Sequence, residues 1–273
     1  MHLSPLRAAL CLSLGGARLS PLGCTSPSQP ELSAPLPPGN NVLFIGNSLT
    51  YANDLPAVVA AVAQSGGVTL QVRGLTAANH ALVDFVLDGS APRAIAQGGW
   101  KHVVLQQGPT TVPICRDTAV MAVRDIAVLA RAVGANAVVM MSWPASNRVG
   151  DFPKVHESAQ MAAVTGSAKF APAGDAWQLA NQADPSLAFY GPDGYHPSAL
   201  GTWLTALVIV EQVTGLDVRT LPTSQPAMAG LPPLSIATMH LLQNAAHAAN
   251  LAGFATPVPT WTPSVPPVPA ITC

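Results

Sequence analysis

The sequence predicts an α/β fold in which a parallel sheet is covered by helices on both faces. Short apolar runs alternate along the chain with longer segments whose apolar residues recur at helical spacing. Apolar residues make up 49% of the 273 residues, so one domain of this length can bury a sizeable core. Strands that alternate with helices are typical of parallel pairing, since each crossover is made by a helix.

Five apolar runs predict the strands. The first covers residues 41–45 and is closed by Gly46, as is typical of a strand buried on both faces. The other predicted strands are residues 68–72, 102–105, 137–141 and 168–171.

Helical periodicity covers the segments between these runs. Residues 54–64 end at Gly66-Gly67, and the long amphipathic segment 117–133 ends at Gly134, since glycine commonly follows the last turn of a helix. The remaining predicted helices are residues 77–87, 91–97, 156–165, 198–214 and 235–252. In such a fold, function lies in the loops at the carboxyl ends of the strands.

The two ends of the chain differ from its body in composition. Residues 1–24 carry Arg7, a short apolar stretch and Cys24 after a small residue, which resembles a bacterial lipoprotein signal; a plain secretory signal is the alternative. Residues 25–39 are a Pro/Ser-rich linker, 40–255 the folded domain and 256–273 a Pro-rich tail. We therefore expect export to the bacterial cell envelope or the medium, with membrane attachment only through a lipidated Cys24.

Charge and motifs exclude several classes of function. The net charge is −1, from 12 Lys+Arg and 13 Asp+Glu, and no basic cluster exists to bind nucleic acid. The longest apolar stretch of the body stops at Glu211, short of the length that spans a bilayer. No Cys or His spacing matches a metal motif, so we expect no metal and no cofactor. Cys115 and Cys273 are left either as a disulfide pair or as two free thiols.

Ser48 follows the first predicted strand, in a turn that Gly46 permits. A turn there lifts the hydroxyl clear of the sheet and points the backbone N–H into the same space, as an activated serine requires. The alternative role is a helix N-cap.

Asp193 and His196 lie three residues apart in a late loop. A nucleophilic serine needs a neutral imidazole to accept its proton, and the imidazole needs an acceptor on its other nitrogen. An Asp turn former beside a His that caps the next helix is the alternative.

Together these two segments resemble the SGNH, or GDSL-type, hydrolases. Phe44-Ile-Gly-Asn-Ser-Leu-Thr50 resembles the first block of that family, with Asn47 in place of the usual Asp, and Asp193-Gly-Tyr-His-Pro-Ser198 resembles its last block. The resemblance implies a flavodoxin-like three-layer sandwich with about five parallel strands, and hydrolysis of acyl esters. It implies Ser48 as nucleophile, His196 as general base and Asp193 as its orienting acceptor.

The middle blocks of the family are matched less regularly. Gly74 best matches the glycine that supplies an oxyanion N–H after the second strand, and Thr110 stands where an oxyanion Asn is usual. A branch of the superfamily reads Leu-Gln at this point, so the amide of Gln106 or Gln107 replaces that Asn. Neighbouring strand residues point to opposite faces, and only one of the two can face the site.

Three further residues are candidates for substrate binding: Asn47, His80 and Trp143. His80 has a capping or surface role as its alternative, and Trp143 a place in the core. The sequence therefore predicts an exported serine esterase acting on short acyl esters of a small molecule or a glycan. The alternatives are an acyltransferase with the same triad and a catalytically inactive, envelope-anchored binding module.

Overall fold

The computed structural model describes residue 36, residues 39–224 and residues 228–253. The predicted targeting segment, most of the linker and the Pro-rich tail lie outside the described residues. Cys115 is disulfide-bonded, but the other cysteines lie outside that part of the chain, so its pairing with Cys273 stays a prediction. In the described part of the chain, no helix has both the length and the hydropathy to cross a bilayer.

A five-stranded, fully parallel sheet forms the centre of the fold, as predicted. Its strand order is β2-β1-β3-β4-β5, with crossovers on both sides of the central strands. The strands are β1 (Asn40–Gly46), β2 (Leu70–Thr76), β3 (Trp100–Gln106), β4 (Asn136–Met140) and β5 (Lys169–Ala171). This confirms the predicted flavodoxin-like α/β sandwich.

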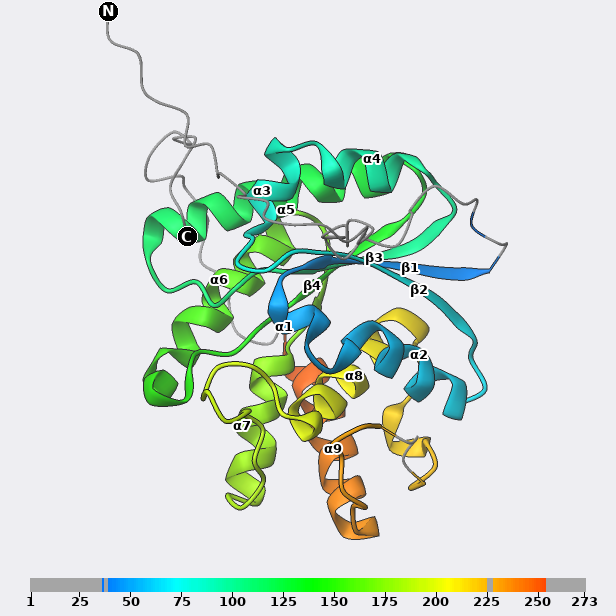
Figure 1. Cartoon of the computed structure of the whole chain (residues 1–273), viewed down its shortest axis with the longest axis vertical. Helices are drawn as coiled ribbons and strands as arrows, with labels where there is room; N and C mark the ends of the chain where they lie inside the picture. Colours follow the sequence, from blue (N-terminus) through cyan, green and yellow to red (C-terminus); the bar gives the residue numbers. More distant parts are fainter. Residues whose placement is uncertain (1–35, 37–38, 225–227, 254–273) are drawn as a thin grey trace, which may run out of the picture. The chain divides into compact units, whose positions relative to one another are not determined.

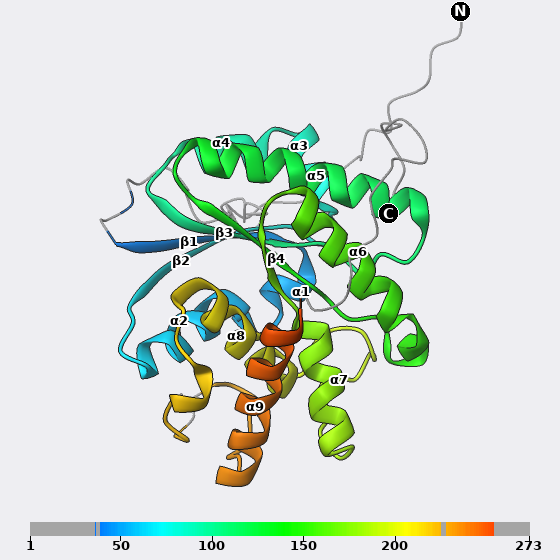
Figure 2. The same ribbon diagram turned by 180° about the vertical axis from the view of Figure 1, so that it is seen from behind.

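Helices cover both faces of the sheet (Figures 1 and 2). One face carries α3 (Leu82–Leu87), α4 (Ser90–Ala96), α5 (Pro113–Ala132) and α6 (Phe152–Thr165). The other carries α2 (Leu55–Ser65), α7 (Ala173–Ala183), α8 (Ala199–Thr214) and α9 (Ile236–Ala252). Short helical turns complete the described elements: α1 (Ser48–Tyr51), η1 (Ala52–Asp54), η2 (Ser146–Asp151) and η3 (Val218–Thr220).

The apolar stretch around Trp203–Val210 belongs to α8. This helix packs against α2, α7 and α9 as well as the sheet, and most of its residues are buried. A helix that is apolar on all sides is stable in water only when it is surrounded in this way. The stretch that raised the mean hydropathy of the chain is therefore a core helix.

Among the predicted boundaries that differ from the structure, two are helix starts near the site. The predicted helix 77–87 begins only at Leu82, because Asn79 has a left-handed backbone (φ 58°) that no helix continues through. The predicted helix 156–165 begins earlier, at Phe152, where Pro153 occupies the first turn. Both differences lie at the carboxyl edge of the sheet, where the loops depart from regular structure.

Candidate active site

Ser48 stands directly beyond the carboxyl end of β1. Gly46 makes this turn possible, because a Cβ there would lie 2.6 Å from Oε1 of Gln106. Asn47 then caps α1, with its side-chain oxygen accepting from the backbone N–H of Leu49 at 3.1 Å. Ser48 is thus the first helical residue, where a backbone N–H has no intrahelical acceptor.

The second part of the site is a tight loop before α8. Tyr190 pairs with Pro197 across the loop, and the N–H of Gly191 donates to the carbonyl of His196 at 2.7 Å. Within the loop, Oδ1 of Asp193 accepts from the backbone N–H groups of Tyr195 and His196, both at 3.0 Å. These bonds fix Asp193 and His196 relative to each other before any substrate arrives.

Ser48, His196 and Asp193 form one continuous chain of hydrogen bonds. His196 Nδ1 lies 2.5 Å from Asp193 Oδ2, and His196 Nε2 lies 2.9 Å from the Ser48 hydroxyl oxygen. The hydrogen bond to His196 and the two backbone N–H groups lower the pKa of Asp193 to about 2. An ionised Asp193 holds the proton on Nδ1, so Nε2 faces the serine as an acceptor. This is the arrangement that activates a serine hydroxyl as a nucleophile.

The catalytic side chains are open to solvent. The side chains of His196 and Asp193 are 40% and 51% exposed. Water and an ester substrate therefore both have access to the serine.

Asn53 ties the two halves of the site together, and the sequence analysis did not single it out. Its side-chain nitrogen donates to the carbonyl of Pro197 at 2.9 Å and to the hydroxyl of Thr202 at 3.0 Å. Asn53 has a left-handed backbone (φ 54°), which Asn tolerates better than most residues. Its polar side chain in a turn after the nucleophile was the only sequence signal available.

The structure separates the roles of the two glutamines at the end of β3. Oε1 of Gln106 accepts from the N–H of Asn47 at 2.9 Å and from the hydroxyl of Thr50 at 2.8 Å. Its Nε2 atom is buried and has no partner within the described part of the chain. An atom that water does not reach is closed to a substrate oxygen of similar size, so Gln106 positions the nucleophile loop from below.

Gln107 is only half-buried, and its Oε1 accepts from the N–H of Leu82 at 2.8 Å. This bond fixes the amide and leaves Nε2 as the donor. Thr110 offers no equivalent, because its hydroxyl donates to the carbonyl of Gly108 at 2.9 Å. Of Gln106, Gln107 and Thr110, Gln107 is therefore the residue whose side-chain nitrogen is best placed to donate to an oxyanion.

Gly74 does not lie where the sequence placed it. The second strand runs to Thr76, so Gly74 is a strand residue paired with Phe44 rather than the first loop residue after the strand. The last residues of the two strands are Gly46 and Thr76, which pair with each other two positions beyond the Phe44–Gly74 pair. The prediction stopped the strand too early, because Arg73 and Gly74 interrupt its apolar pattern.

The three predicted substrate-binding residues lie in different surroundings. Asn47 and His80 meet, with the Asn47 side-chain nitrogen donating to the His80 carbonyl at 3.1 Å. Trp143 is fully buried and stacks on Trp177 at a ring distance of 3.7 Å, which is the core alternative. Its indole N–H donates to the carbonyl of Tyr195 at 3.0 Å, so it supports the catalytic loop from beneath.

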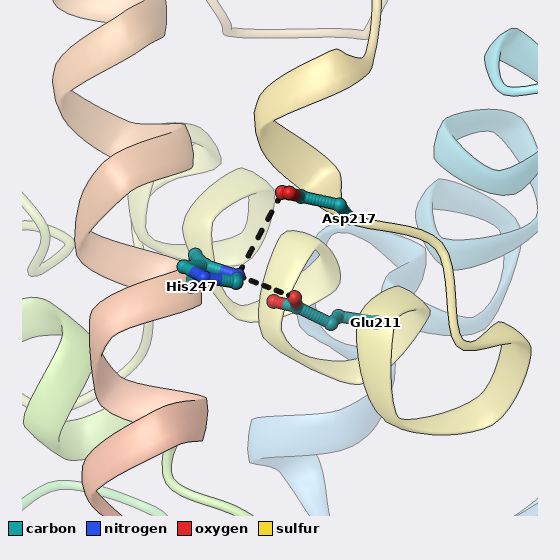
Figure 3. Close-up of side chains that lie close together, drawn as sticks. All are labelled: Glu211, Asp217 and His247. Carbon is teal, nitrogen blue, oxygen red and sulfur yellow. Dashed lines mark hydrogen bonds and ion pairs between the residues drawn. The ribbon is translucent and has the colours of Figure 1, made fainter.

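Among the described residues, one cluster of potential metal ligands lies at the C-terminal end of α8, whereas the loop that carries His196 lies before its first residue. Figure 3 shows Glu211 and Asp217 facing the ring of His247, with the ligand atoms within 4.8 Å of one another. His247 Nδ1 already lies 2.6 Å from Glu211 Oε1. The Arg219 guanidinium donates two hydrogen bonds to the Asp217 carboxylate, from Nε to Oδ1 at 2.9 Å and from Nη2 to Oδ2 at 2.6 Å. These side chains hold α8, η3 and α9 together by mutual ion pairing, which the sequence analysis did not anticipate.

Comparison with known proteins places this geometry in a known fold. No protein-family model matches the chain, and no curated protein matches it in sequence. A DUF4886 family protein from Bacteroides uniformis matches with a TM-score of 0.62 at 17% identity, over 78% of this chain and 95% of that one.

Two further structures relate the fold to ester chemistry. A protein assigned to the SGNH hydrolases, from Slackia heliotrinireducens, is 26% identical with a TM-score of 0.54, over 63% of this chain and 98% of that one. A catalytic mutant of an acetylxylan esterase from Geobacillus stearothermophilus is 15% identical with a TM-score of 0.52, over 66% and 97% of the two chains. The similarity supports the fold of an SGNH-type hydrolase for this chain.

Proposed function

We propose that this chain, which has the fold of the SGNH hydrolases, is an exported serine esterase that hydrolyses short acyl esters. The observation that carries the proposal is the unbroken hydrogen-bond chain from Ser48 through His196 to Asp193. Two loops separated by 148 positions in the sequence converge on this geometry. A helix cap and a turn former have no reason to meet in this way.

In the proposed reaction, the Ser48 oxygen attacks the ester carbonyl while His196 Nε2 accepts its proton. The negative charge that develops on the carbonyl oxygen is stabilised by the Ser48 N–H and by Nε2 of Gln107. The imidazolium is stabilised by ionised Asp193 and returns the proton to the leaving alcohol. Water, activated by the same imidazole, then hydrolyses the acyl-enzyme and regenerates Ser48.

Hydrolysis is favoured over acyl transfer by the openness of the site. The imidazole of His196 is 40% exposed, so water has direct access to the acyl-enzyme. Short acyl groups on carbohydrate are the proposed substrates. The acetylxylan esterase among the structural neighbours supports this choice.

The test is hydrolysis of p-nitrophenyl esters over a series of acyl lengths by the full chain. Ser48→Ala is compared with a matched control, Ser65→Ala, whose hydroxyl donates to the carbonyl of Val62 at the end of α2. We expect the parent and the control to hydrolyse the acetate ester, and Ser48→Ala to be inactive.

Two results would contradict the proposal. Equal activity of Ser48→Ala and the parent would place the nucleophile elsewhere. If the parent is inert on every ester but acylates an added alcohol from the same donors, the chain is an acyltransferase.

A further inference from the structure

A groove of about 560 Å³ opens beside the loop that carries Asp193 and His196. Trp177 and Phe189 form its base, and Val149 and Ala188 contribute exposed apolar surface. Three amide side chains along α7 also line it: Gln178, Asn181 and Gln182. Its volume is in the range of small-molecule binding sites in proteins. We call it the α7 groove.

The α7 groove shares a wall with the active site. Tyr190 lines the groove, and its backbone pairs with Pro197, the residue that follows the catalytic His196. On the other side Ser146 also lines the groove, and its N–H donates to the carbonyl of Gly194 at 2.8 Å. Two walls of the groove therefore bond directly to the loop that carries Asp193 and His196.

The chemistry of the lining selects a neutral ligand with hydroxyl groups. Among the described residues, no Asp, Glu, Lys, Arg or His lines the groove. Each amide of Gln178, Asn181 and Gln182 offers both donors and an acceptor, which matches a hydroxyl group that both donates and accepts. An apolar base under such a rim matches the C–H face of a sugar ring, whereas a purely apolar acyl chain would leave the amides unpartnered.

The groove is rigid before any ligand binds. Trp177 stacks on Trp143, and its indole N–H donates to the carbonyl of Gly201 at 3.2 Å. Phe189 and Tyr190 lie against the same ring, with centroid distances of 5.5 Å and 5.2 Å. A preformed base lowers the ordering cost of binding.

We infer that the α7 groove binds the carbohydrate chain on the alcohol side of the ester. This inference rests on the proposed esterase function, because it places the acyl group at Ser48 and the sugar chain across the turn. An acetylated monosaccharide is too short to fill both sites, so longer acetylated oligosaccharides are the preferred substrates.

The test compares the double variant Asn181→Ala/Gln182→Ala with the control Gln97→Ala. The altered and control side chains are all exposed, and alanine favours the α7 helix. The measured quantity is kcat/KM for acetylated xylo-oligosaccharides of increasing length, divided by kcat/KM for p-nitrophenyl acetate. Loss of two hydrogen bonds should lower this ratio about 10-fold for long substrates in the double variant. The control should keep the parental ratio.

A second variant, Ala188→Trp, fills the groove with a bulky ring and should lower the same ratio without removing an amide. If both groove variants keep the parental ratio at every length, the inference is wrong. If they instead lower turnover of p-nitrophenyl esters with long acyl chains, the groove takes the acyl side and the inference is overturned.

Binding separates this inference from the proposed function. Calorimetry with unacetylated xylo-oligosaccharide and the Ser48→Ala chain needs no turnover. Binding that is lost in the groove variants supports the groove even if esterase activity is absent. Absence of binding alongside normal ester hydrolysis contradicts the groove alone.

Discussion

Two histidine–carboxylate pairs in this molecule have similar Nδ1-to-carboxylate distances but differ in solvent exposure and in what the second ring nitrogen contacts. At the carboxyl edge of the sheet, His196 Nδ1 lies 2.5 Å from Asp193. Between α6 and α7, His156 Nδ1 lies 2.7 Å from Asp175. The difference lies at the other nitrogen: Nε2 of His196 meets the Ser48 hydroxyl, whereas Nε2 of His156 is buried without a partner in the described residues.

This comparison shows that a histidine–carboxylate pair is not by itself catalytic machinery. The His196 pair is exposed and its Nε2 atom faces the Ser48 hydroxyl, as the proposed mechanism requires. The His156 pair is mostly buried, its ring packs edge-on against Phe170, and no serine hydroxyl bonds to it. Its hydrogen bond connects two helices, as the His247–Glu211 pair connects α8 and α9.

The largest expected effect is a difference in kcat between variants of His196 and of His156. His196→Asn should lower kcat for p-nitrophenyl acetate by at least about 10⁴-fold, because the general base is lost. His156→Asn should leave kcat at the parental value. Steady-state kinetics below the unfolding temperature of each variant measures this contrast, and comparable losses in both would refute the assignment of His196.

Asp193 and Asp175 should differ in the same way, because only the substitution of Asp193 should lower kcat. Asp193→Asn should lower kcat about 10³-fold, because an amide no longer stabilises the imidazolium, although water at this exposed site replaces part of its role. The low pKa of Asp193, about 2, keeps this carboxylate ionised at working pH. Asp175→Asn should retain kcat; a pH–rate profile for each variant tests both statements.

A smaller effect should distinguish Gln107 from Gln106 within the site. Gln107→Ala should lower kcat about 10²-fold with little change in KM, as expected for a donor that acts in the transition state. Gln106→Leu should instead lower the free energy of unfolding by about 1–3 kcal/mol, because the N–H of Asn47 loses its buried acceptor. The reverse pattern in kinetics and chemical denaturation would exchange the two roles.

The smallest effect concerns stability alone. The hydrogen bond that His156 donates to the Asp175 carboxylate raises the pKa of His156, so the folded state holds a proton that the unfolded state releases more easily. Its stabilisation is fully present below the ordinary histidine pKa and is lost as pH rises through the raised value. Asp175→Asn should therefore cost about 2 kcal/mol in acid and progressively less in alkali. A pH-independent cost in urea denaturation would contradict this account, and Asp193→Asn serves as the exposed comparison.

The sequence by itself determined the layered α/β architecture and the two segments that carry the triad. Periodicity reports burial directly, so the strands and most of the long helices were predicted within a few residues, whereas α7 was not among the predicted helices. Ser48, Asp193 and His196 were identified because the segments that carry them together resemble the first and last blocks of the SGNH hydrolases. Irregular loops escaped this reasoning, since the left-handed Asn79 and the extension of β2 past Gly74 leave no periodic signal.

Only the tertiary structure decided which of several equivalent side chains acts. Gln106 and Gln107 are identical in the sequence, and their roles differ because one is enclosed beneath the nucleophile loop and the other is half-buried above Leu82. His156 and His196 each find a carboxylate, and only the convergence of distant loops gives His196 a serine. Burial and the second hydrogen-bond partner depend on residues far along the chain. A local pattern therefore identifies the type of group that a site needs, and packing selects the residue.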